Sequence, residues 1–169
     1  MKNIVLIGIM GSGKTTFGHM LSQITGHEMI DLDDYLVNRF NMSIPDMFAI
    51  SEDYFRNNET LCCKEVSELE GKIISTGGGV IKRPENMTYL KKNGVVFYID
   101  RPIEDIVNDV DPSGRPLLKD GPDKLYALDK ERRDKYMSSC DYHIINDGSL
   151  EKVIETILDI MKEYDKSSL

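Results

Sequence analysis

The sequence predicts an α/β protein with a five-stranded parallel sheet and helices on both faces. Short β-prone runs alternate with helix-like stretches along the 169 residues, a pattern that favours parallel strands joined by helical crossovers. A glycine-rich phosphate motif directly follows the first apolar run. No run approaches the roughly 18 apolar residues of a membrane span, so no membrane partner is expected.

The expected strands are short runs rich in β-branched residues. The clearest helix follows Ser149, which we expect to act as its N-cap, with apolar residues at helical spacing from Val153 to Met161. Another helix opens at Ser51, with Phe55, Cys62, Val66 and Leu69 as its expected apolar stripe. The five strands are expected at residues 4–7, 28–31, 72–75, 95–99 and 142–145.

Length and composition predict one domain over residues 1–169. The segment 111–122, DPSGRPLLKDGP, is expected to be a long loop because it holds three prolines and two glycines. There are 29 acidic and 21 basic side chains, and the net charge of −8 argues against a nucleic-acid partner. The cysteines Cys62, Cys63 and Cys140 form neither a CxxC pair nor an even framework, and the N-terminal region lacks a signal-peptide pattern. We therefore expect reduced thiols and a cytoplasmic location.

Residues 8–15, GIMGSGKT, match the phosphate-binding pattern GxxxxGK[ST] between an expected strand and an expected helix. Backbone N–H groups of such a loop converge on phosphate oxygens, the lysine reaches the β- and γ-phosphates, and the threonine hydroxyl can bind Mg²⁺. The alternative is a plain glycine-rich turn, and the motif alone does not separate a kinase from an NTP-driven switch. The residues expected to bind nucleotide here are Gly11, Ser12, Gly13, Lys14, Thr15 and Thr16.

Two carboxylates, Asp31 and Asp33, are expected at the end of the second strand, where ligands of parallel sheets bind. One of these carboxylates can hold a water of the Mg²⁺ shell, while the other can accept a hydrogen bond from an attacking hydroxyl and align or deprotonate it. A solvated helix cap is the alternative interpretation of this pair.

Arg56 lies off the expected apolar stripe of its helix. Glu52 and Glu59 stand four residues before it and three after it, a spacing at which they can orient its guanidinium to grip a carboxylate. A solvated surface ion pair is the ordinary alternative. The third strand runs into Gly77-Gly78-Gly79, where three glycines indicate close approach to the backbone or, alternatively, a flexible turn.

Together these residues resemble the shikimate kinase family. The resemblance spans residues 4 to about 155, and the ordered combination of motifs is more specific than the phosphate loop alone. The motifs that carry it are the phosphate loop, DLD at 31–33, FRNNE at 55–59, GGG at 77–79, GRPLL at 114–118 and RRDKY at 132–136.

The resemblance implies a nucleoside monophosphate kinase-like fold and a monomer that transfers the γ-phosphoryl group of ATP, with Mg²⁺, to a ring hydroxyl of shikimate. The product would be shikimate 3-phosphate, in the pathway to aromatic amino acids. Lys14, Asp33 and Arg115 would be catalytic, with Arg115 on a lid at 111–122 that also meets the nucleotide. Contacts to shikimate would come from Asp33, Arg56, Gly78, Gly79 and Arg132. Without the resemblance, Arg132 would be taken for part of a charged helix face.

The chain departs from the family pattern in ways that bear on adenine. Relatives often have a basic residue at the position of Asn108, and another in the loop at 146–149, where this chain has NDGS. Ser51 stands where glycine is frequent. We therefore expect the triphosphate to be held firmly and the base loosely.

Two other functions remain open on the sequence alone. A gluconate-type kinase would use the same phosphate loop and lid, although two arginines around a glycine triplet favour a cyclic carboxylate as acceptor. A P-loop regulatory switch or assembly ATPase would need a guanine-reading motif or an oligomer interface, and the sequence shows neither.

Overall fold

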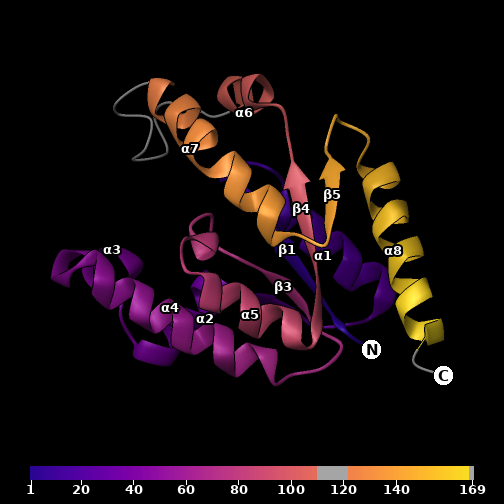
Figure 1. Cartoon of the computed structure of the whole chain (residues 1–169), viewed down its shortest axis with the longest axis horizontal. Coiled ribbons are helices and arrows are strands. Elements are labelled where there is room, and N and C mark those ends of the chain that lie inside the picture. The colour runs from indigo at the N-terminus through magenta and orange to yellow at the C-terminus, as the bar shows by residue number, and fades with distance from the viewer. Residues whose placement is uncertain (110–121, 168–169) are drawn as a thin grey trace.

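The computed structural model describes residues 1–109 and 122–167, which form a five-stranded parallel sheet in the order β2-β3-β1-β4-β5 (Figure 1). The predicted α/β class and the five predicted strands are confirmed, each within one residue at either end. The strands are β1 Asn3–Ile7, β2 Met29–Asp31, β3 Ile73–Ser75, β4 Gly94–Asp100 and β5 Tyr142–Ile145.

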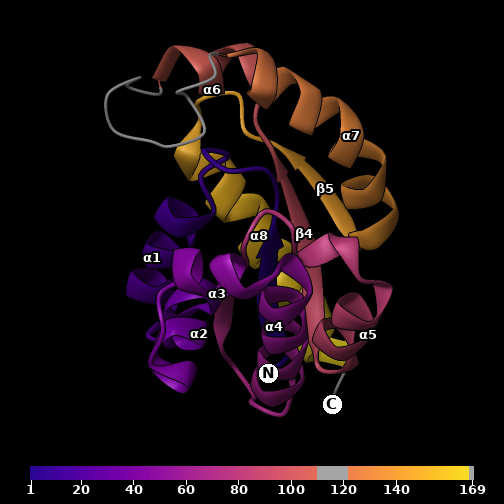
Figure 2. The same ribbon diagram turned by 90° about the vertical axis from the view of Figure 1, so that its left-hand side faces the viewer.

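Helices cover both faces of this sheet, as predicted. Figure 2 shows α2, α4 and α5 in front of the sheet and α8 behind it. Their bounds are α1 Lys14–Thr25, α2 Leu32–Phe40, α3 Ile44–Ile50, α4 Glu52–Ser67, α5 Pro84–Lys92, α6 Ile103–Asp109, α7 Asp123–Ser139 and α8 Leu150–Ser167, with a 3₁₀ turn η1 at Val80–Lys82.

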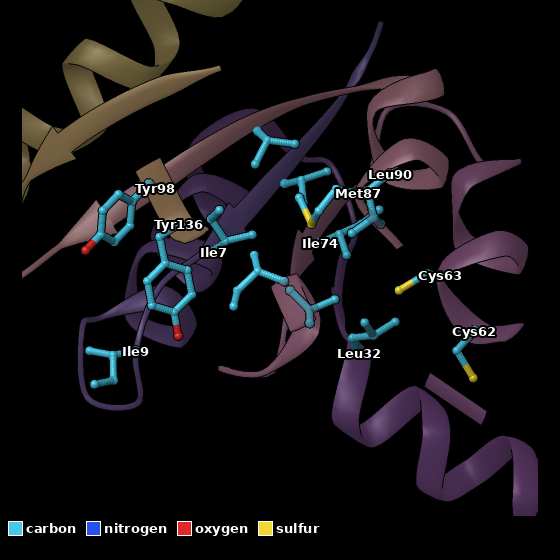
Figure 3. Packing of buried hydrophobic residues seen from close by; sticks show 14 of the residues in the cluster. Ile7, Ile9, Leu32, Cys62, Cys63, Ile74, Met87, Leu90, Tyr98 and Tyr136 are labelled. Carbon is cyan, nitrogen blue, oxygen red and sulfur yellow. The ribbon is translucent and has the colours of Figure 1, made fainter. Parts of the chain in front are cut away.

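Each face of the sheet has its own apolar core, because side chains alternate between the faces of a strand. In β1, Ile4 and Leu6 pack with α1 and α8, whereas Val5 and Ile7 pack with the helices from α2 to α7. Figure 3 shows the core on the face with Val5 and Ile7, in which Tyr136 of α7 stacks on Tyr98 of β4 with 5.1 Å between ring centroids. Helix α7, which carries the candidate site residue Arg132, is therefore fixed to the sheet by aromatic packing.

The expected helix after Ser149 is confirmed, and Val153, Ile154, Ile157 and Met161 of α8 are buried. One expected core position is wrong. Leu69 lies beyond α4, which ends at Ser67, and it is 37% exposed. Its carbonyl accepts hydrogen bonds from Asn3 and Asn93, so this residue belongs to the turn that leads into β3.

The sheet order places the phosphate loop after the central strand. β2 and β3 lie on one side of β1, and β4 and β5 lie on the other. The segments that follow these strands meet at one edge of the sheet, where ligands bind in open α/β folds. None of the helices within residues 1–109 and 122–167 has the length and hydropathy to cross a bilayer.

Candidate active site

The phosphate loop connects β1 to α1 and forms one wall of a cavity of about 670 Å³. Gly13 caps α1 with φ of 107°, a conformation that favours glycine, and this lets the first turn of the helix face the cavity. Gly11, Gly13, Lys14, Thr15 and Thr16 line the cavity, so its wall carries the positive end of a helix dipole.

Lys14 is the buried cation of this wall. Its Nζ donates hydrogen bonds to the carbonyls of Gly8 at 2.5 Å and Ile9 at 3.0 Å. Burial lowers the pKa of Lys14 to about 8, an effect that Asp33 opposes and Arg132 reinforces. An anionic ligand beside Lys14 would favour the protonated form and restore the higher pKa.

The two candidate carboxylates line the same cavity. Asp31 ends β2, and its Oδ1 accepts hydrogen bonds from the backbone N–H groups of Asp33 and Asp34. Asp31 therefore caps α2 and also lines the cavity, so the role of helix cap does not exclude a position that faces a ligand. The expectation that Asp33 ends the strand is wrong: because Asp31 caps the helix, Asp33 lies in the first turn of α2. Burial and the neighbouring Asp31 raise the pKa of Asp33, while Lys14 opposes the rise.

The glycine triplet after β3 leaves room for three charged side chains. None of its residues has a positive φ, so steric space explains these glycines better than backbone conformation does. An added Cβ at Gly77 would lie 3.0 Å from Oδ1 of Asp33, one at Gly78 would lie 3.2 Å from Nη1 of Arg132, and one at Gly79 would lie 2.5 Å from Nη2 of Arg56. The alternative of a simple flexible turn does not account for these close approaches.

Arg56 is buried, contrary to the interpretation of a solvated surface pair. Its Nη1 donates to Oε1 of Glu59 at 2.9 Å, and Oε1 of Glu52 lies 3.6 Å from its Nε. Glu59 is almost fully buried, whereas Glu52 also binds Lys82 at 2.8 Å. The two glutamates hold the guanidinium over Gly79, as their spacing in the sequence predicts.

The adjacent arginines of α7 have different surroundings. Arg132 faces Gly78, and its Nε is buried with no hydrogen-bond partner among the described residues. Arg133 instead donates two hydrogen bonds to Asp100, at 2.8 and 3.0 Å. The structure therefore brings Arg132, and not Arg133, to the glycine triplet.

A comparison with protein-family models matches residues 10–162 of this chain to the model described as shikimate kinase. The chain belongs to the shikimate kinase family.

Curated relatives support this assignment over nearly their whole length. A shikimate kinase of Clostridium botulinum (strain Alaska E43 / Type E3) is 43% identical, over 95% of this chain and 98% of the relative. One from Caldicellulosiruptor bescii is 42% identical over 87% of each chain.

Solved shikimate kinase structures share the fold. The structure from Acinetobacter baumannii in complex with shikimate has a TM-score of 0.86 and 32% identity, covering 97% of this chain and 94% of its own. The structure from Aquifex aeolicus has a TM-score of 0.81 and 36% identity, covering 96% and 98%. The expected P-loop, nucleoside monophosphate kinase-like fold is confirmed.

Some residues at this candidate site were not among the predicted site residues. Arg101, the first residue after β4, lines the cavity and donates to the carbonyl of Gly11 at 3.1 Å. Asn146, the first residue after β5, donates from Nδ2 to the carbonyl of Ser12 at 3.0 Å. Tyr136, which ends the RRDKY motif, donates to the carbonyl of Gly78 at 2.6 Å. For Asn146 the available signal was its position directly after the strand predicted at 142–145, and for Arg101 its position two residues after the strand predicted at 95–99.

The predicted lid at 111–122 lies outside the described residues except for Pro122, and Arg115 lies outside them altogether. Asn108 is the next-to-last residue of α6, close to the cavity-lining Asp109.

Proposed function

We propose that this chain transfers the γ-phosphoryl group of ATP to a ring hydroxyl of shikimate, giving shikimate 3-phosphate and ADP. The observation that carries the proposal is the convergence of Asp33, Arg56 and Arg132 on the glycine triplet, which lies beside the phosphate loop. Family membership supports the same reaction.

The acceptor side suits a molecule with one carboxylate and several hydroxyls. Arg56 and Arg132 each present a guanidinium, the group that matches a carboxylate in a planar, two-bonded geometry. Because Glu59 fixes Arg56 and the packing of Tyr136 fixes α7, both cations are positioned before the ligand binds. Gly78 and Gly79 let the ligand and the arginines approach the backbone.

The reacting hydroxyl belongs beside Asp33. Burial raises the pKa of Asp33, which makes its carboxylate a better proton acceptor than an ordinary aspartate. Lys14 and the N-terminus of α1 stabilise the charge on the β- and γ-phosphates. Hydroxyl and phosphate are thereby aligned across the cavity for in-line transfer.

Magnesium is part of this proposal. Thr15 and Asp31 line the same cavity, and a hydroxyl together with a carboxylate fits Mg²⁺, which takes oxygen ligands and keeps waters. When bound with ATP, the ion would neutralise charge on the phosphates. Oδ1 of Asp31 already caps α2, so its contribution would come through the other oxygen or through a water.

The role of Arg115, the monomeric state and the location of the protein are proposed from the sequence. Arg115 would meet the phosphoryl group from the lid, and Arg115→Ala should lower kcat more than it weakens ATP binding. The proposed active form is a monomer. Free cysteines and the use of ATP support a cytoplasmic location.

An acceptor panel tests the proposal. ATP consumption by the protein with Mg²⁺ would be measured alone, with shikimate and with gluconate. Shikimate should stimulate turnover strongly and gluconate should not. Stimulation by gluconate alone would assign the other kinase activity, and turnover unaffected by either acid would favour a regulatory or assembly NTPase.

A further inference from the structure

Arg101 is a cation of the cavity that no motif accounts for. It directly follows β4, and its side chain is 23% exposed. One nitrogen, Nη1, donates to the carbonyl of Gly11 in the phosphate loop, and Nη2 pairs with Asp109 of α6. Arg101 and Asp109 both line the cavity, so this ion pair is part of its wall.

The sheet order indicates which end of a nucleotide Arg101 faces. Asp33, Arg56 and the glycine triplet follow β2 or β3, on one side of the central strand β1, and Arg132 reaches Gly78 from α7. The transferred phosphate must lie between those residues and the phosphate loop. The rest of the nucleotide then extends toward the other side, over the segments that follow β4 and β5. Arg101 is in that region.

The charge of the cavity gives Arg101 a function there. Among the described residues that line the cavity, the cations are Lys14 and Arg101, whereas Asp31, Asp33 and Asp109 are acidic. Lys14 belongs to the β- and γ-phosphate end. Besides Lys14, Arg101 is therefore the cation among the described lining residues that an anionic nucleotide can meet in this cavity.

Asp109, the last residue of α6, holds the guanidinium of Arg101. This ion pair places a cation that follows β4 beside the end of α6.

We propose that Arg101 binds the nucleoside half of the nucleotide, at the α-phosphate and the base, and this inference rests on the proposed use of ATP. A guanidinium can donate to a phosphate oxygen along one edge and lie against an aromatic base with its face. The bond to Gly11 fixes its position beside the phosphate loop.

Binding of ADP and of magnesium pyrophosphate, measured by calorimetry, tests this assignment. Pyrophosphate occupies the phosphate loop but lacks the nucleoside half. Arg101→Gln should weaken ADP binding roughly tenfold and leave pyrophosphate binding unchanged. The matched control is Arg39→Gln, an exposed arginine of α2 paired with Glu65, which should alter neither. Equal losses for ADP and pyrophosphate would show that Arg101 only supports the loop and would overturn the proposal.

Asp109→Asn separates a ligand contact from a structural link between α6 and the phosphate loop. It keeps the cation and removes its acidic partner, so ADP should bind as well as before or more tightly. A loss equal to that of Arg101→Gln would contradict the proposal. Arg101→Lys retains the charge, so its affinity for ADP should lie between those of the wild type and Arg101→Gln. This order would show that the loss in the glutamine variant is not a folding defect.

Shikimate-dependent turnover of the wild type tests the proposed function separately from the role of Arg101. If shikimate failed to stimulate ATP consumption, that function would fall, but the ADP and pyrophosphate comparison would still decide the role of Arg101. If the function holds, Arg101→Gln should raise KM for ATP and leave KM for shikimate unchanged.

Discussion

At the scale of single residues, one cavity brings together the cation and the carboxylate to which the proposal gives different functions. Lys14 belongs to the phosphate loop, and Asp33 belongs to the first turn of α2. Lys14→Ala should abolish transfer and weaken ATP binding, because it removes the charge beside the phosphates. Asp33→Asn should also abolish transfer but leave ATP binding nearly unchanged. Calorimetry with ATP and a turnover assay check both variants, and near wild-type turnover in Asp33→Asn would show that Asp33 does not align the acceptor.

The lowered pKa of Lys14 predicts a pH dependence. Protonated Lys14 binds phosphate, and its pKa of about 8 means that the proton is lost as the pH rises through that value. kcat/KM for ATP should therefore fall above about pH 8, while kcat at saturating ATP should persist to higher pH because bound phosphates raise the pKa. Lys14→Arg stays protonated and should not show this fall. A flat profile of kcat/KM in the wild type up to about pH 9.5 would contradict the assignment.

The arginines of the acceptor side make a third prediction. Arg56→Lys and Arg132→Lys keep the charge but lose the two-pronged geometry, so each should raise KM for shikimate roughly ten- to a hundredfold, or about 1.5 to 3 kcal/mol. Steady-state kinetics with varied shikimate measure this.

Arg133→Lys is the matched control on the same helix. It breaks the paired bonds to Asp100 and should lower the melting temperature with little change in KM for shikimate. An increase in KM equal to that of Arg132→Lys would mean that the wrong arginine has been assigned to the acceptor.

At the scale of elements, the turn after β3 determines where charged side chains lie. An added methyl group at Gly79 would displace the guanidinium of Arg56, and one at Gly77 would press on Asp33. Gly79→Ala should therefore mainly raise KM for shikimate, whereas Gly77→Ala should mainly lower kcat. Kinetics of the two variants side by side check this contrast. Identical effects on both constants would indicate that the triplet is only a turn.

The elements themselves were largely predictable because the period of apolar residues determines them. All five strands and the helix after Ser149 follow from that local pattern. Asp33 and Leu69 were misplaced because their positions depend on where a helix begins or ends, which is set by the Asp31 cap and by the turn into β3.

The candidate site was predictable where a motif or a spacing encodes it. The glutamates around Arg56 are such a case, since residues three and four apart in a helix are neighbours. Arg101 was missed because its contacts to Gly11 and Asp109 depend on the packing of α6 beside the phosphate loop, and its position just after a predicted strand does not encode that packing.

At the scale of the whole molecule, strand order separates the two substrates. The central position of β1 puts the phosphate loop between the proposed acceptor residues that follow β2 and β3 and the proposed nucleotide residue Arg101 that follows β4, while α7 brings Arg132 to the acceptor side. The net charge of −8 opposes binding of two anions, so binding depends on cations gathered at this one edge of the sheet. The fold therefore explains how an acidic chain can hold ATP and a carboxylic acid together.

Mass spectrometry of a reaction containing the protein, ATP, Mg²⁺ and shikimate tests the central claim most directly. The account predicts a new species heavier than shikimate by one phosphoryl group, formed together with ADP and absent when Asp33→Asn replaces the wild type. The claim would be contradicted if ADP formed while shikimate stayed unmodified, or if no reaction occurred although the protein bound ATP.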